Sequence, residues 1–149
     1  MPTPERHPFP KGILLGFTHG TLECRQINPT REFQCGFLGV QTLRHSQPSF
    51  ITWLGQRSFY IVGVEAGDQV HPQSPDNRWE LTVASEEDVR AAHAAATEGA
   101  AKWGIQYVSP ISTLDGYPWF YLKDLNGNHW GISTRGVDWV ESAFARGDA

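Results

Sequence analysis

Three polar side chains alternate along one short stretch of the chain. His19, Thr21 and Glu23 are spaced two residues apart, so they fall on one side of an extended strand. Leu22 and Cys24 fall on the other side. Imidazole, hydroxyl and carboxylate groups that share a face can bind a ligand or transfer protons. The spacing therefore predicts a strand with one functional face and one packing face.

A second stretch downstream nearly repeats this pattern. It reads Arg-Trp-Glu-Leu-Thr-Val over residues 78–83, with Arg78 at the position of His19 and Glu80 two residues further on. Each stretch is followed by a helix start and then by further strand patterns. The chain is therefore predicted to contain two copies of a βαβββ unit.

The signals that bound the first unit are turn and cap residues. We expect a strand over residues 13–25, a short helix opened by Asn28 as N-cap and Pro29 at its first position, and strands over residues 40–45, 49–54 and 59–65. Gly39 ends the helix, and Phe33 and Phe37 share one of its faces.

A Pro- and Gly-containing linker over residues 67–77 leads to the second unit. The expected elements are a strand over residues 78–83, a helix from the cap Ser85 to Gly104, and strands over residues 107–112, 118–123 and 129–134. Asn126-Gly127 marks the turn before the last of these strands, and residues 137–144 are predicted to form a terminal helix.

Length and composition indicate one α+β domain. The chain has 149 residues, which suits a single core. We expect an extended arm over residues 1–12, one domain over residues 13–134 made of modules 13–66 and 78–134, and a tail over residues 135–149. The six Trp, eight Phe and four Tyr predict a well-filled core first and an apolar small-molecule pocket second.

Charge and hydropathy exclude several partners. The net charge is −4 and no run of Lys or Arg occurs, so nucleic acid is excluded as a partner. No segment approaches the roughly 20 apolar residues of a membrane span, and the first ten residues lack the apolar stretch of a signal peptide. The expected location is the cytoplasm, where Cys24 and Cys35 stay reduced.

Several motifs together resemble the vicinal oxygen chelate superfamily, the group of glyoxalases, bleomycin-resistance proteins and extradiol dioxygenases. They are His19 to Glu23 (HGTLE), the helix end Phe37-Leu38-Gly39 after Phe33, and residues 120–128 (FYLKDLNGN). The resemblance covers residues 13–134. It implies two βαβββ modules that form a U-shaped, mostly antiparallel sheet around a cup.

The resemblance also implies a divalent metal in that cup, held in ring-cleaving dioxygenases by two His and one Glu. Of these positions His19 matches, whereas Arg78 and Gly131 replace the other two ligands. Neither an arginine nor a glycine side chain offers a lone pair for a metal.

Substitute ligands for Fe, Mn, Ni or Zn would be His19, Glu80 and Glu23. A shift of two strand positions, however, moves a ligand by roughly 6 to 7 Å, against metal bonds of about 2.0 to 2.2 Å. We therefore expect no cofactor.

The resemblance then gives the cup residues new roles. Arg78 takes the place of the metal and stabilises a substrate oxyanion. His19 becomes a general acid or base, which Glu80 or Glu23 orients. Tyr121 donates a hydrogen bond or proton to the same oxygen. An alternative interpretation of Arg78 is that it only neutralises Glu80.

The remaining candidates complete the predicted cup. His129 is a second acid or base. Thr21 and Glu23 contact the substrate, and Trp53, Phe59 and Trp119 form apolar walls.

Three functions stay open on this evidence. The first is a metal-independent cyclase, isomerase or lyase acting on an apolar, oxygenated small molecule. The second is a metal-dependent dioxygenase or glyoxalase-like enzyme. The third is a protein that binds and sequesters an apolar or aromatic small molecule without converting it. A homodimer is expected in each case.

Overall fold

The first unit forms a four-stranded sheet covered by one helix. The computed structural model describes residues 10, 12–55 and 59–148. The elements of the first unit are β1 (His19–Cys24), α1 (Ile27–Gly36), β2 (Gln41–Arg44), β3 (Ser49–Trp53) and β4 (Tyr60–Glu65). Their sheet, here called sheet A, has the order β1-β4-β3-β2, with β1 parallel to β4 and the other pairs antiparallel.

The second unit repeats this arrangement with one extra short strand. A 3-10 turn, η1 (Gly67–Gln69), precedes β5 (Trp79–Thr82), α2 (Glu86–Trp103), β6 (Tyr107–Val108), β7 (Ser112–Leu114), β8 (Tyr117–Lys123) and β9 (His129–Ser133). Their sheet, here called sheet B, has the order β5-β9-β8-β6, with β7 also paired to β8. Helix α3 (Val137–Arg146) follows β9. The predicted α+β class with two βαβββ units is confirmed.

Several boundaries differ from the sequence-based prediction. Helix α1 ends at Gly36, with Phe37 as its C-cap, rather than at Gly39. The strand expected from residue 13 begins at His19, because β4, the strand that pairs with β1, begins opposite it at Tyr60. The first helix begins at Ile27 rather than after Asn28, since the Glu65 carboxylate accepts the Ile27 backbone N–H at 2.9 Å. The strand expected over residues 107–112 is split into β6 and β7, because Pro110 has no N–H to donate.

Caps at the second helix match the prediction. The Ser85 hydroxyl accepts the Asp88 backbone N–H at 3.2 Å, and Gly104 ends the helix in the left-handed region with φ of 70°. No helix in the described part of the chain is long and apolar enough to cross a membrane.

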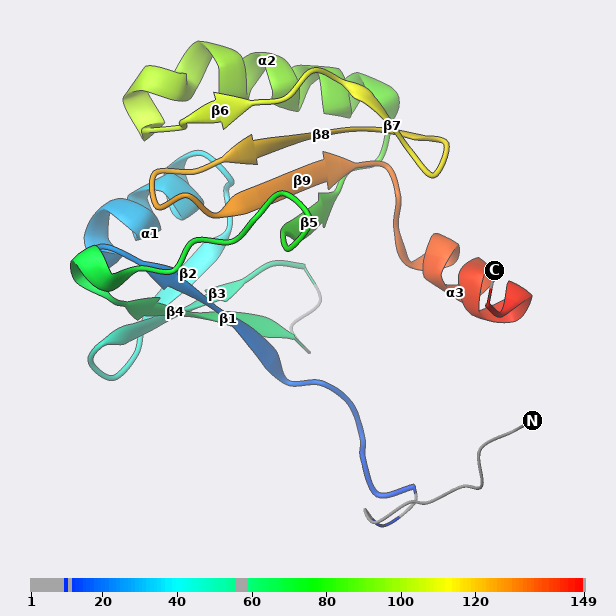
Figure 1. Ribbon diagram of the computed structural model, residues 1–149, viewed down its shortest axis with the longest axis horizontal. Coiled ribbons are helices and arrows are strands. Elements are labelled where there is room, and N and C mark those ends of the chain that lie inside the picture. Colours follow the sequence, from blue (N-terminus) through cyan, green and yellow to red (C-terminus); the bar gives the residue numbers. More distant parts are fainter. Residues whose placement is uncertain (1–9, 11, 56–58, 149) are drawn as a thin grey trace.

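The strands form two sheets rather than the one continuous sheet that we expected (Figure 1). In the described residues, β1 pairs only with β4 and β5 only with β9. The Trp79 ring lies against Gly20, where a Cβ atom would collide with it. Strands β1 and β5 therefore meet through a side chain and not through backbone hydrogen bonds.

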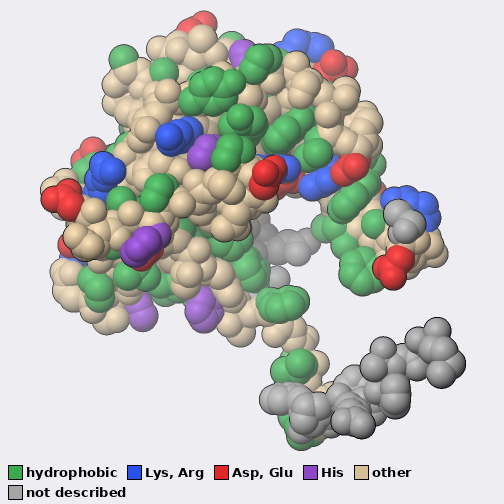
Figure 2. Space-filling view, viewed as in Figure 1, with side chains coloured by type: hydrophobic (Ala, Val, Ile, Leu, Met, Phe, Trp, Pro, Cys, Tyr) green, Lys and Arg blue, Asp and Glu red, His purple; other side chains and the backbone are tan. Residues whose placement is uncertain are grey.

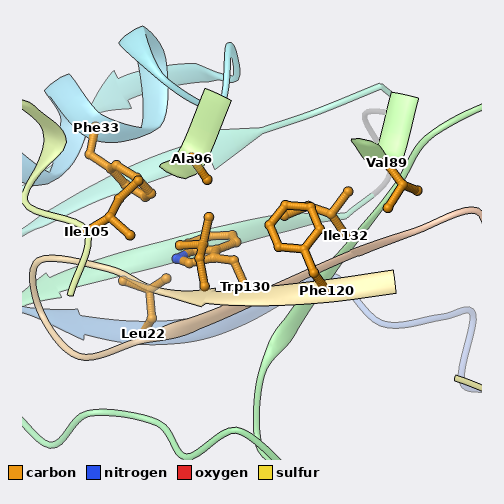
Figure 3. Close-up of a cluster of buried hydrophobic side chains, with 9 residues drawn as sticks. Leu22, Phe33, Val89, Ala96, Ile105, Phe120, Trp130 and Ile132 are labelled. Carbon is orange, nitrogen blue, oxygen red and sulfur yellow. The ribbon is translucent and has the colours of Figure 1, made fainter. Parts of the chain in front are cut away.

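One hydrophobic core joins the two units (Figure 3). Leu22 of β1 and Phe33 of α1 pack in the same cluster as residues of α2, β8 and β9, with Trp130 at its centre. The buried members are Leu22, Phe33, Val89, Ala96, Ile105, Phe120, Leu122, Trp130 and Ile132. A smaller cluster packs Cys24 against Ile27 and Phe50, and burial raises the pKa of the Cys24 thiol.

The turn between β8 and β9 fastens the units together through polar groups. The buried Asp124 carboxylate accepts the backbone N–H groups of Asn126 and Asn128 and the Trp130 indole N–H at 2.8 to 3.0 Å. Burial raises the pKa of Asp124. The Asn126 side chain accepts the Arg25 backbone N–H at 2.9 Å, and Asn128 donates to the Glu23 carbonyl at 2.8 Å. The turn therefore positions β9 against β1.

The shared core predicts that both units unfold together. Phe33→Ala removes a side chain that is 1% exposed, and a change of this kind costs about 3 to 5 kcal/mol. Chemical denaturation followed by far-UV circular dichroism and tryptophan fluorescence should show one transition at a lower midpoint for both signals. Leu43→Ala, at a side chain that is 63% exposed, is the control and should change stability by less than about 0.5 kcal/mol. A second transition that keeps the wild-type midpoint would contradict the shared core.

Candidate functional site

The outward faces of the two sheets carry the candidate residues. Because side chains alternate along a strand, the buried Leu22 and Cys24 place His19, Thr21 and Glu23 on the outward face of sheet A. In sheet B the buried Phe120 and Leu122 likewise place Trp119 and Tyr121 outward. The predicted polar face of β1 therefore exists, but it lies on a different sheet from Arg78 and Tyr121.

A row of three residues crosses the outward face of sheet B. Glu80, Gly131 and Tyr121 lie opposite one another on β5, β9 and β8. A Cβ atom at Gly131 would lie 3.2 Å from the Arg78 Nε and 3.2 Å from the Glu80 Cγ and Oε1 atoms. The space left by the missing side chain is thus filled by the Arg78 and Glu80 side chains.

Glu80 is held between two guanidinium groups. Its Oε1 atom accepts the Arg78 Nε–H at 2.8 Å and lies 2.7 Å from Arg78 Nη2. Its Oε2 atom lies 2.9 Å from Arg135 Nη2, and Arg135 also contacts Asp115 at 2.6 Å. The Arg78, Arg135 and Glu80 side chains are only 15%, 19% and 24% exposed. The charge pairing of Arg78 with Glu80 is therefore present.

Further contacts fix the orientation of Arg78. Its Nη1 atom donates to the Pro75 carbonyl at 2.7 Å, and its guanidinium carbon lies 4.5 Å from the centre of the Trp119 ring. Arg135 makes a similar contact with Trp139 of α3, at 4.2 Å. Cation–π contacts of this kind strengthen as water is excluded. Arg78 therefore lies against sheet B and does not point into the solvent.

His129 has a defined tautomer on the same face. Its Nδ1 atom lies 3.1 Å from the Gln73 carbonyl oxygen, which only accepts, so Nδ1 carries the hydrogen and Nε2 has the lone pair. Burial lowers the pKa of His129 and Lys123 lowers it further, while the hydrogen bond to Gln73 raises it. The Tyr121 ring centre lies 5.8 Å from the His129 ring centre and 5.6 Å from that of Trp119. A neutral imidazole, a phenol and a guanidinium thus occur along one sheet face.

His19 and Glu23 have other partners on sheet A. The His19 ring stacks on Tyr60 with ring centres 4.9 Å apart, and its Nδ1 atom lies 2.9 Å from the Thr18 hydroxyl. Glu23 accepts the His71 backbone N–H at 2.6 Å, and this hydrogen bond is the main reason that the pKa of Glu23 is lowered. In the described residues neither side chain is seen to bond to Arg78 or Glu80, but Thr21, Glu23 and Arg78 line one hollow of about 610 Å³.

The three expected wall residues lie in three separate places. Trp119 is on sheet B, beside Arg78. Trp53 lines a hollow of about 680 Å³ on sheet A with Ile51, Leu43 and Tyr60. Phe59 lies 6.0 Å from Trp79 between the two sheets and lines a different hollow. The expectation of a single apolar wall is therefore wrong. Trp53 and Trp119 lie on the outward faces of different sheets, and Phe59 lies between the sheets.

The residues present do not fit the metal that the resemblance implies. In the described ranges no group of three His, Cys, Asp or Glu side chains is placed to hold an ion. Glu80 is occupied by two arginines and Glu23 by His71, whereas His19 stacks on Tyr60. The possible ligands His19, Glu80 and Glu23 are therefore not brought together within one chain.

Three residues of the site were missed by sequence reasoning. Arg135, Gln73 and Trp139 carry no motif, and all three lie in segments that were assigned to the linker or the tail. Arg135 lies just beyond β9. It reaches Glu80 because β9 pairs with β5, and the sequence gives no local signal for that contact.

Two tandem βαβββ units, each with a parallel first and last strand, define the fold. The chain has the fold of the glyoxalase and bleomycin-resistance proteins of the vicinal oxygen chelate superfamily. The sequence itself matches no protein-family profile and no curated protein.

Solved structures support this assignment of the fold. A fosfomycin resistance protein, FosX, from Listeria monocytogenes is similar over 85% of this chain and 98% of its own, with a TM-score of 0.65 and 16% identity. A possible glyoxalase from Bacillus cereus covers 80% of this chain and 99% of its own, with a TM-score of 0.64 and 16% identity. The FosX protein from Mesorhizobium loti covers 87% and 99%, with a TM-score of 0.62 and 12% identity.

The geometry at His129 predicts a measurable titration. We expect its pKa below the ordinary value of 6.5, because burial disfavours the charged imidazolium. NMR of ¹⁵N-labelled protein should show the Nδ1–H tautomer at neutral pH and protonation only under more acidic conditions. His129→Gln assigns the signal by removing it. An Nε2–H tautomer, or a pKa above 6.5, would contradict the assignment.

The same shift predicts a pH dependence of stability. Where the pKa of a His is lowered by folding, the unfolded chain binds the extra proton first, so stability falls as pH drops below the unfolded value near 6.5. When the pH is lowered from above 6.5 to below it, the free energy of unfolding should fall more for the wild type than for His129→Gln. Urea denaturation at both pH values measures the difference, and equal losses would contradict it.

Proposed function

We propose that the chain is a metal-independent enzyme that catalyses cyclisation, isomerisation or elimination on an apolar, oxygenated small molecule. Its working surface is the outward face of sheet B. The observation that carries the proposal is the presence on one face of a guanidinium, a phenol and a neutral imidazole, those of Arg78, Tyr121 and His129. In the base-catalysed form of each reaction, a proton is removed next to a carbonyl group and an oxyanion develops on that oxygen.

His129 is the general base in this proposal. Its Nε2 atom has the free lone pair, because Nδ1–H is directed to the Gln73 carbonyl. A lowered pKa keeps the imidazole neutral near pH 7, which a base requires. His129 takes a proton from a C–H or O–H bond of the substrate and later returns it to another atom. This moves the role first assigned to His19 onto sheet B.

Arg78 and Tyr121 stabilise the oxyanion that forms when the proton leaves. The guanidinium is fixed by Glu80, Pro75 and Trp119, so it does not reorganise during the reaction. Glu80 is shared with Arg135, which is also paired with Asp115, so two guanidinium groups face two carboxylates at this point of the sheet. Trp119 and Tyr107, whose ring lies 5.7 Å from that of Tyr121, offer apolar surface to the rest of the substrate.

A binding function without chemistry is the second candidate. The hollow on sheet A is lined by apolar and aromatic side chains, chiefly Leu43, Ile51, Trp53 and Tyr60. Such a surface suits an apolar ligand that is held and released unchanged. His19 and Thr21 lie on the same outward face and would contact that ligand.

A metal-dependent enzyme is less well supported. One FosX structure from Listeria monocytogenes contains Mn(II) and a sulfate ion. In this chain, however, the arginine contacts of Glu80 would have to break before it could bind a cation.

Proton exchange tests the proposal without knowledge of the natural substrate. In D₂O containing EDTA, the protein should accelerate deuterium exchange next to the carbonyl of an apolar ketone such as 2-tetralone, followed by NMR. His129→Gln should lower the rate by about a hundredfold or more, the usual contribution of a general base. Arg78→Lys should also lower it, because a lysine cannot reproduce the fixed fork of donors.

His45→Gln is the matched control, since His45 lies outside sheet B and contacts Ser49. It should keep the wild-type rate. Equal exchange with and without the protein, together with quenching of tryptophan fluorescence by the ketone, would leave only the binding function. Loss of the exchange on adding EDTA would instead favour the metal-dependent enzyme.

A further inference from the structure

Two apolar segments of the chain are exposed and stand clear of the body. One is the segment just before β1, residues 13–17, which is called the arm from here on; its Leu15 and Phe17 are 102% and 91% exposed. The other is helix α3, where Phe144 is 83% exposed. Figure 1 shows both segments projecting from the two sheets, and Figure 2 shows hydrophobic side chains on each. Within one chain these side chains remain in contact with solvent.

The exposed apolar area is large for a monomer. The seven large side chains concerned are Ile13, Leu14, Leu15, Phe17, Val137, Val140 and Phe144. Their exposed fractions run from 45% to 102%. Taking roughly 150 to 250 Å² for a large side chain, the seven together present on the order of 1,000 Å², whereas a standard interface buries about 800 Å² on each partner. The area is thus sufficient for a stable interface.

We propose that the arm of each chain packs on the apolar side of α3 in a second copy of the same chain. The two segments are complementary in kind: residues 12–18 carry no charge, and α3 presents Val137, Val140 and Phe144. A two-fold axis then makes two equivalent contacts, each joining one arm to one helix. No other partner is needed to cover both segments at once.

The interface lies beside the candidate site of sheet B. Arg135, which holds Glu80, stacks on Trp139 of α3 at 4.2 Å. A partner arm on α3 would therefore border that site. The pairing itself rests only on the exposed segments and not on the proposed reaction.

Analytical ultracentrifugation tests the interface. Wild type should sediment at twice the 16.7 kDa chain mass. Leu15→Asp and Phe144→Asp should each raise the dissociation constant about tenfold or more, as expected for buried apolar anchors. Ile111→Asp, at a partly exposed apolar side chain away from both segments, is the control and should leave the dimer intact. Because Leu15 and Phe144 are exposed, circular dichroism should show that both variants fold.

Mixing the two variants distinguishes the arm-to-helix contact from other dimers. In a mixed dimer, the intact arm of the Phe144→Asp chain meets the intact α3 of the Leu15→Asp chain. The mixture should therefore associate more tightly than either variant alone. A monomeric wild type, a dimer unaffected by either substitution, or no gain on mixing would overturn the proposal.

Discussion

The carboxylate of Glu80, held between Arg78 and Arg135, is the interaction on which the candidate site depends. It fixes both guanidinium groups, and it fills the space above Gly131 that a longer side chain would otherwise take. The three side chains are only 15% to 24% exposed, and charges that are partly shielded from water are stabilised by pairing, so removing one member would leave the others less well compensated. The same contacts hold Arg78 against Trp119, next to Tyr121 and His129. The ion pairs of Glu80 with Arg78 and Arg135 therefore hold the side chains in place and also set the charge distribution on this face of sheet B.

The position of this face follows from the way the two units pack. Leu22 and Phe33 of the first unit enter the core of the second, so both sheets direct their inward sides toward one cluster. The buried Asp124 turn reinforces this packing through Asn126 and Asn128. As a result, the outward face of sheet B holds Arg78, Tyr121 and His129, while that of sheet A holds His19, Glu23 and an apolar hollow around Trp53. Thr21 and Glu23 of sheet A line a further hollow together with Arg78.

Much of the fold was predictable from residue patterns. The two βαβββ units, the Ser85 cap and the Gly104 stop follow from local signals that the tertiary structure did not override. The outward alternation of His19, Thr21 and Glu23 was also predictable. It was not predictable that Thr21 and Glu23 line a hollow with Arg78 while His19 stacks on Tyr60, because this depends on how the two sheets meet. The role of Gln73 was not predictable either. It orients His129 through its backbone carbonyl, and a backbone contact of this kind leaves no side-chain pattern in the sequence.

The central claim is that a guanidinium–carboxylate pair takes the place of a metal centre in this fold. Isothermal titration of chelator-treated protein with Mn²⁺, Ni²⁺ or Zn²⁺ tests it most directly, with Glu80→Gln and His19→Ala as comparison variants. The account predicts no saturable one-to-one binding, because each carboxylate in question already has a partner in the chain. Binding of one equivalent that is lost in both variants would contradict it.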